Sequence, residues 1–101
     1  MPLDVIWTSG ASEDYLKADA RLAPTRAIDG LVQLLRLFPD MGAPESPTLR
    51  RVLVGRRRVY GLYYSSSPSR IIVLALADLR QDPGTIEKIL RNRGIVSSGN
   101  R

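Results

Sequence analysis

The chain has 101 residues, of which 44% are hydrophobic and 25% are charged, and its formal net charge is +5. This length supports one small folded domain, and the composition is that of a globular protein rather than a disordered one. The chain contains no cysteine and no histidine. Their absence excludes disulfides, zinc thiolate sites and Cys/His or Ser/His nucleophilic chemistry within it. We therefore expect no metal and no cofactor.

The apolar runs of the chain are short. None approaches the roughly 18 residues that cross a bilayer, and the N-terminal residues lack the basic-then-apolar layout of a signal peptide. We therefore expect a cytoplasmic protein that makes no contact with a membrane.

The positive charge is concentrated in the second half of the chain. Residues 1–49 carry four basic and seven acidic side chains, 4 − 7 = −3, whereas residues 50–101 carry eleven basic and three acidic ones, 11 − 3 = +8. Thirteen of the fifteen basic residues are arginine, whose planar fork binds phosphate or carboxylate with two hydrogen bonds. The second half is thus predicted to engage an anionic partner; the alternatives are a genome rich in arginine codons and a plain solvated basic face.

The first half is predicted to form one strand and two helices. Residues 3–8 are mainly β-branched or aromatic, which indicates a strand. Ser9 can cap a helix over residues 10–21, which must end before Pro24. Residues 25–38 are predicted to form an amphipathic helix that packs antiparallel to the first. Its apolar residues at helical spacing are Ile28, Leu31, Leu35 and Phe38.

The second half is predicted to be a β-meander. Residues 39–47 hold three prolines and are expected to form a loop. Three β-type runs follow, at residues 48–54, 57–64 and 70–77, and their short connectors predict antiparallel pairing. The third run is apolar at every position after its first residue, as in a strand that is central or covered on both faces.

A short helix is predicted to close the domain. Asp82 followed by Pro83 is a helix-start signal, and Gly94 is a stop signal, so the helix is placed at residues 85–93. Residues 96–101 are expected to be disordered.

The order of elements predicts an α+β fold in two layers. The N-terminal strand and a helical hairpin are expected to pack on one face of an antiparallel sheet, and the other face is expected to stay open. Residues 1–95 would form this single domain.

Side-chain alternation suggests where the arginines of the sheet lie. On the middle run, Tyr60, Leu62 and Tyr64 are assigned with Arg58 to the helices, so Arg57 and Tyr63 are assigned to the open face. On the preceding run we favour burial against the helices of two leucines, Leu49 and Leu53, which puts Arg50 on the open face.

Arg80 follows the last strand and can reach the same end of the sheet as Arg57. The expected result is a cluster of guanidinium groups from Arg50, Arg57 and Arg80 that requires an anionic counterpart. The alternative is three separately solvated charges.

Four segments together resemble the RelE/ParE superfamily of toxins from type II toxin–antitoxin systems. They are VIWTSGASEDYL, FPDMG, LRRVLVGRRRVYGLYY and RIIVLALADLRQDP, and the resemblance covers roughly residues 4–83. It implies a toxin that is neutralised in a hetero-oligomer by a cognate antitoxin, whose acidic and apolar segment folds upon the domain.

The resemblance leaves two activities open, because one branch of the superfamily cleaves mRNA on the ribosome and another poisons DNA gyrase. For the cleaving branch it implies that Arg50, Arg57 and Arg80 hold the scissile phosphate. The remaining candidates for contact with a partner or nucleic acid are Arg51, Arg56, Arg58, Arg91 and Arg93.

The C-terminal tyrosine or histidine that assists proton transfer in the cleaving branch has no counterpart in residues 83–94. Guanidinium cannot act as a base, so acid–base help could come only from Tyr63, Tyr60, Asp78 or Lys88. The ending LRQDP also looks more like the gyrase-poisoning branch. We therefore favour a ParE-like, non-nucleolytic toxin, with a ribosome-dependent endoribonuclease and a non-toxic nucleic-acid-binding module as alternatives.

Overall fold

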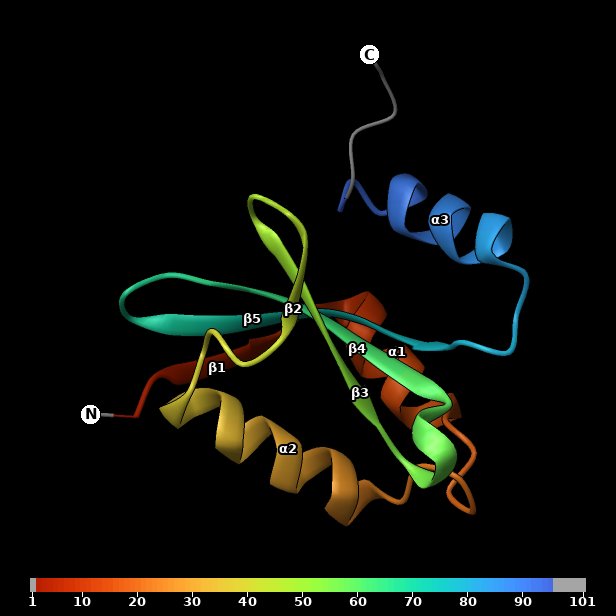
Figure 1. Ribbon diagram of the computed structural model, residues 1–101, viewed down its shortest axis with the longest axis horizontal. Helices are drawn as coiled ribbons and strands as arrows, with labels where there is room; N and C mark the ends of the chain where they lie inside the picture. The colour runs from red at the N-terminus through yellow and green to blue at the C-terminus, as the bar shows by residue number, and fades with distance from the viewer. Residues whose placement is uncertain (1, 96–101) are drawn as a thin grey trace.

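A twisted five-stranded sheet forms the centre of the computed structural model, which describes residues 2–95 (Figure 1). The strand order is β1-β5-β4-β3-β2. The elements in chain order are β1 (Asp4–Trp7), α1 (Ser9–Lys17), α2 (Thr25–Leu37), β2 (Ala43–Ser46), β3 (Leu49–Val54), the 3₁₀ turn η1 (Arg56–Arg58), β4 (Tyr60–Ser66), β5 (Arg70–Asp78) and α3 (Pro83–Asn92). No helix among these residues is long and apolar enough to cross a membrane.

The predicted meander is confirmed, since β3, β4 and β5 pair in antiparallel order. Two further strands flank it. β1 pairs in parallel with β5, which makes the sheet mixed. The expectation of a loop throughout residues 39–47 is wrong, because β2 pairs with β3. Pro44 lacks an amide hydrogen, yet a proline is tolerated there because β2 is an edge strand.

The first helix is shorter than the predicted span of residues 10–21. Its N-cap is Thr8 rather than Ser9, and the Thr8 side-chain oxygen accepts from the amide of Ala11 at 3.2 Å. The helix ends at Lys17, and Asp19 then accepts a hydrogen bond from the amide of Arg21 at 3.0 Å. Such a local side-chain bond competes with helix continuation.

α2 has the predicted amphipathic pattern, and its buried residues are Ile28, Leu31, Val32 and Leu35. Phe38 was expected on the same apolar stripe, but it is 59% exposed. It follows the last helical residue, Leu37, so it leaves the helical periodicity that would have turned it toward the sheet.

Helices pack on both faces of the sheet, but they cover the two faces unequally. α1 and α2 pack over one face, on a core that includes Tyr60, Leu62 and Tyr64 as predicted. α3 packs over the other face through Ile86 and Leu90, and buries Leu49, Tyr63 and Ala75. The expectation of an open second face is therefore wrong where α3 lies, although Ile6 and Leu53 of that face remain 42% and 39% exposed. Cover on both sides explains why the predicted third run, now β5, is apolar at nearly every position.

The pairing of β4 with β5 shifts register between Tyr63 and Tyr64. Tyr63 pairs with Ala75 and Tyr64 with Val73, so Leu74 is an extra residue on β5. As a result Leu74 and Ala75 both lie with the core beneath α3, although they are adjacent in sequence.

α3 begins and ends with the signals expected. The Asp82 carboxylate accepts from the amide of Thr85 at 3.3 Å, with Pro83 in the first turn, and Gly94 takes a positive φ of 73° after the helix. The prediction of disorder at residues 96–101 lies outside the described residues.

A partly buried ion pair ties the end of α3 to α1. Arg93 donates two hydrogen bonds to the Asp14 carboxylate, at 2.7 Å and 2.8 Å. The same carboxylate accepts from the amide of Leu76 at 3.0 Å. β1 pairs with β5 only as far as Val73, so Asp14 occupies the position beside β5 that a longer β1 would fill.

Candidate functional site

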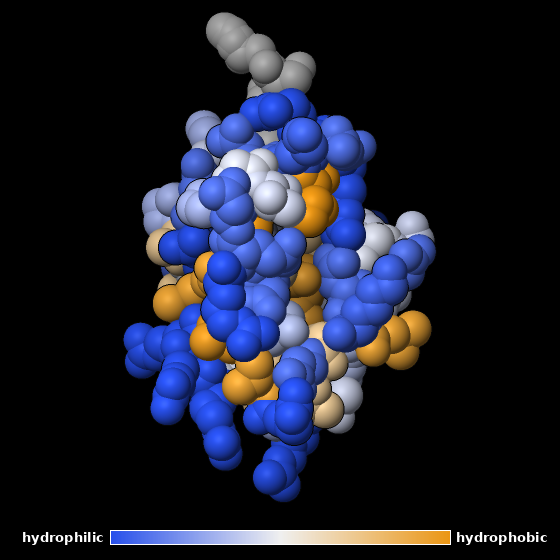
Figure 2. Space-filling model, turned by 90° about the vertical axis from the view of Figure 1, so that its right-hand side faces the viewer, coloured by the Kyte–Doolittle hydropathy of each residue, from blue (hydrophilic) through white to orange (hydrophobic). Residues whose placement is uncertain are grey.

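Three chain segments bring five arginines together at one end of the sheet. The amide of Arg56 in η1 donates to the carbonyl of Leu22, and the amide of Leu79 donates to the carbonyl of Val59 at 2.7 Å. The loop after α1, the turn η1 and the segment after β5 therefore lie side by side. We call this surface the basic end, defined by Arg21, Arg56, Arg57, Arg58 and Arg80. Figure 2 shows strongly hydrophilic side chains projecting from the lower edge of the molecule, where η1 lies in Figure 1.

The turn η1 has an unusual backbone. Gly55 has a φ of 92°, and a Cβ atom at this position would lie 2.6 Å from the carbonyl oxygen of Leu22, so only glycine fits. Arg57 and Arg58 also have positive φ, 57° and 54°. The middle strand therefore begins at Tyr60 rather than at Arg57, and Arg58 does not point toward the helices as expected but is exposed with Arg56 and Arg57.

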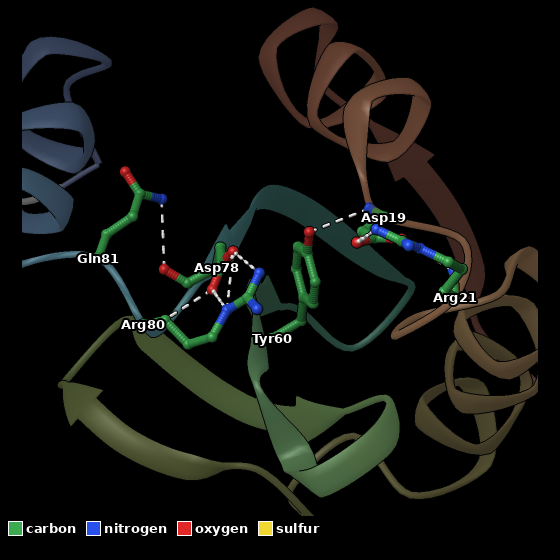
Figure 3. A network of polar contacts seen from close by, with 6 residues as sticks. All are labelled: Asp19, Arg21, Tyr60, Asp78, Arg80 and Gln81. Carbon is green, nitrogen blue, oxygen red and sulfur yellow. Dashed lines mark hydrogen bonds and ion pairs between the residues drawn. The ribbon is translucent and has the colours of Figure 1, made fainter.

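Carboxylates partly neutralise the other two arginines of the basic end (Figure 3). Arg80 donates to Asp78 at 2.9 Å and 2.6 Å, and Arg21 donates to Asp19 at 3.3 Å. The hydrogen bond from Arg80 lowers the pKa of Asp78, and the one from Arg21 lowers the pKa of Asp19. Five arginines against two carboxylates, 5 − 2 = +3, leave the basic end positive.

Arg50 does not join the basic end, so the expected convergence of Arg50 with Arg57 and Arg80 is wrong. Arg50 pairs in register with Tyr64, whose side chain lies in the core under α1 and α2. It donates to the carbonyls of Gly42 at 2.7 Å and Asp40 at 3.2 Å. Arg50 therefore holds the loop before β2 to the sheet.

The assignment of two leucines of β3 to the helices is wrong for the same reason. Leu49 is buried beneath α3 rather than under α1 and α2, and Leu53 is 39% exposed. Val52 and Val54 pack with the core under α1 and α2 instead.

A groove with a volume of about 440 Å³ runs between α3 and the sheet. Apolar side chains form its floor, and two ion pairs stand at its rim, Arg51 with Glu45 at 3.8 Å and Arg91 with Glu87. Figure 2 shows apolar surface between hydrophilic side chains across the middle of this face. The apolar residues that line the groove are Leu49, Tyr63, Leu79, Pro83, Ile86 and Leu90.

The described arrangement of strands and helices matches a solved structure. No protein-family model matches the chain, and no curated protein matches its sequence. A chain from the structure "Chromosomal ParDE TA system from P. aeruginosa" superposes with a TM-score of 0.56 and 19% identity, over 76% of this chain and 96% of that one. The chain has a ParE-like fold. The RelE/ParE-like architecture expected from the sequence is thereby confirmed.

Within this ParE-like fold, the acid–base candidates are poorly suited to proton transfer. Tyr63 is 3% exposed and lies beneath α3, away from the basic end. The Tyr60 hydroxyl accepts from the amide of Asp19 at 3.0 Å, and Asp78 is engaged by Arg80 with a lowered pKa, which makes it a weaker base. Lys88 is on α3.

Two contributors to the basic end could not have been found from local pattern. Arg21 lies in the loop that follows α1, and it reaches the basic end because its neighbour Leu22 accepts from the amide of Arg56. Asp19 lies in the same loop and supplies a counter-charge to Arg21.

Arg93, which is predicted to contact a partner, instead forms an ion pair with Asp14 within the domain.

Proposed function

We propose that the chain is the toxin of a type II toxin–antitoxin system and acts in the cytoplasm on DNA gyrase without cleaving nucleic acid. The single observation that carries this proposal is the fold shared with a chain of a ParDE system over nearly all of that chain. The strongly basic second half of the sequence supports a target or partner with negative charge.

The groove beneath α3 is the proposed docking site for the cognate antitoxin. Its apolar floor would accept apolar side chains of a segment that folds on binding. At its rim, Arg51 and Arg91 could exchange their own carboxylate partners for those of an acidic antitoxin segment. The result would be a toxin–antitoxin hetero-oligomer.

A non-nucleolytic action is favoured over RNA cleavage because the basic end offers charge without a proton carrier. Cleavage through a 2′-hydroxyl needs a group that takes a proton and one that returns it. Tyr60 and Asp78 are the titratable candidates nearest Arg57 and Arg80, and both are engaged in other hydrogen bonds.

Controlled expression tests the toxin class and its target together. Induction should arrest growth, leave transcripts intact, and yield protein that inhibits supercoiling or stabilises the cleavage complex of gyrase with DNA. Growth that continues at full rate with folded protein present would refute the toxin proposal. Arrest accompanied by ribosome-dependent cleavage of transcripts would replace gyrase with mRNA as the target.

A charge reversal on α3 tests the antitoxin site. Arg91→Glu should leave growth arrest intact while more antitoxin, supplied from the adjacent reading frame, is needed for rescue. Lys88→Glu makes the same charge change on the same helix outside the groove lining and serves as the control. Equal rescue of both variants would remove the groove from the proposal.

A further inference from the structure

Three consecutive arginines occupy a turn whose backbone disfavours them. Arg57 and Arg58 both lie in the left-handed region, at φ values of 57° and 54°. Side chains with a Cβ atom are strained there, and glycine or asparagine normally takes such positions. Residues held in strained conformations cluster at functional sites, where the surrounding structure fixes them.

The structure around the turn does fix it. Gly55 lies against the backbone of Leu22, and the amide of Arg56 donates to the Leu22 carbonyl. The amide of Arg58 donates to the carbonyl of Gly55 at 3.0 Å. The strained conformation is thus held from both sides, and the arginine side chains are displayed from a preorganised backbone.

The guanidinium groups of the turn have no partners of their own within residues 2–95. Arg56, Arg57 and Arg58 are exposed and make no ion pair or side-chain hydrogen bond there. Arg21 and Arg80 beside them are paired, so the turn holds the unneutralised charge of the basic end. Arginines placed this close repel one another and gain most from an anion that meets several at once.

The chemistry of the surrounding surface favours phosphate over an acidic protein. Interfaces between proteins have a core depleted of charged residues, whereas the turn is bordered by further charged groups, the pairs of Arg21 with Asp19 and of Arg80 with Asp78. A phosphodiester backbone is bound by this kind of surface, where arginine forks meet successive phosphates.

We propose that η1 is a nucleic-acid-binding tip whose three arginines contact successive phosphates of the backbone without reading bases. The proposal goes beyond the toxin function and stands without it. The contacts that hold the turn in its strained conformation fix the backbone from which the three side chains project.

Salt-dependent binding provides the test. Affinity of the purified chain for a fluorescent duplex DNA and for a single-stranded RNA is measured by anisotropy across a range of salt concentrations. If three phosphates are neutralised, the turn contributes about 0.9 × 3 ≈ 2.7 to the slope of log K against log salt on duplex DNA, and about 0.7 × 3 ≈ 2.1 on a single strand. Arg56→Gln/Arg57→Gln/Arg58→Gln should lose that part of the slope, and the nucleic acid that shows the loss is the ligand.

A matched control removes an arginine at the other end of the sheet. Arg70 is exposed at the start of β5, and Asp78 at the far end of that strand pairs with Tyr60 beside the turn. Arg70→Gln should leave the slope unchanged. A slope that is equally steep in the triple variant, or competition by polyglutamate as strong as by DNA, would overturn the proposal.

Two further variants separate strain from charge when they are compared with the glutamine variant, which removes the charge and keeps the strained backbone. Arg57→Gly/Arg58→Gly should raise the melting temperature by about 4 °C while weakening binding, because the strain and the mutual repulsion are both relieved. Arg57→Lys/Arg58→Lys keeps the positive charge and the strained backbone, and should retain most of the slope. A glycine variant that is less stable than the parent would contradict the role given to strain.

The two proposals fail separately. A chain that arrests growth yet shows no slope attributable to η1 would overturn the binding tip and leave the toxin standing. A chain that binds DNA through η1 but never slows growth would do the reverse.

Discussion

Disrupting the ion pair between Asp14 and Arg93 should loosen α3 from the sheet. The Asp14 side chain is 18% exposed and that of Arg93 29% exposed, so the pair is screened less than a surface pair. Hydrogen bonds to charged groups contribute roughly 1.5 kcal/mol or more. Asp14 also satisfies the amide of Leu76, which would lose its acceptor in Asp14→Ala.

These contributions give numbers for a double-mutant cycle. Arg93→Gln removes only the pair and should cost about 1.5 kcal/mol of the free energy of unfolding. Asp14→Ala removes the pair and strands the amide, for about 3 kcal/mol, and the double variant should cost the same 3 kcal/mol. The coupling energy is therefore about 1.5 kcal/mol.

Urea unfolding followed by circular dichroism measures each free energy, and hydrogen exchange of the α3 amides locates the effect. The control is the pair of Glu87 with Arg91, one helical turn apart and solvent-exposed at the rim of the groove, whose coupling should be only about 0.3 to 0.5 kcal/mol. Effects of Asp14→Ala and Arg93→Gln that simply add would refute the reasoning, as would unchanged exchange in α3.

Three further predictions concern groups whose roles the structure reassigns or defines. Tyr64→Phe removes a buried hydroxyl that accepts from the amide of Gly42 at 3.0 Å and should cost about 2 kcal/mol in urea unfolding; a loss below about 0.5 kcal/mol would mean that water replaces the hydroxyl. Arg50→Gln should lower stability by about 1 kcal/mol, because its bonds to the loop are lost, and leave the salt slope of nucleic-acid binding intact; a changed slope would return Arg50 to the binding surface. Because Arg80 lowers the pKa of Asp78 in the folded state, their pair stabilises the fold above the ordinary carboxyl pKa, and that stability is lost as pH falls through the lowered value. Asp78→Asn should therefore show a smaller loss of melting temperature between about pH 5 and pH 2 than the parent chain, and equal losses would exclude the pair as a source of pH dependence.

The parts of the fold that sequence predicted well are those with strong periodicity. α2 shows helical spacing over three turns, and β4 alternates Tyr60, Leu62 and Tyr64 toward one face. The Asp82 cap and the Gly94 stop placed both ends of α3 to within two residues, at 85–93 against the observed Pro83–Asn92. In each case one local rule outweighed its competitors.

The predicted placement of Arg50 was wrong because side-chain alternation allowed two opposite assignments of β3. β3 carries apolar residues at both phases of its alternation, so burial alone could not choose between them. The deciding fact was tertiary, because α3 covers the second face and buries Leu49 there. Once Leu49 lies beneath α3, alternation puts Arg50 on the face of the sheet that α1 and α2 cover.

The left-handed turn gave no warning in the sequence. A run of Gly-Arg-Arg-Arg carries none of the asparagine or aspartate that usually marks two consecutive positive φ values. Arg57 is therefore predicted to be a strand residue, although it lies in the turn η1. Its joining with Arg80 at one end of the sheet was foreseen because strand order alone brings those segments together.

The pair of Asp14 and Arg93 also protects the edge of β5 from pairing with a strand of another copy of the chain. Beyond the last residue of β1, the amide of Leu76 donates to Asp14, and Arg93 donates at 3.4 Å to the carbonyl of Leu74. The Asp14 carboxylate thus accepts from the amide at the strand edge, and the Arg93 guanidinium donates to the carbonyl there. Both backbone groups are already hydrogen-bonded and cannot pair with an incoming strand. Sheet edges without such protection template aggregation; chains stripped of both side chains are accordingly expected to self-associate through β5 before they unfold.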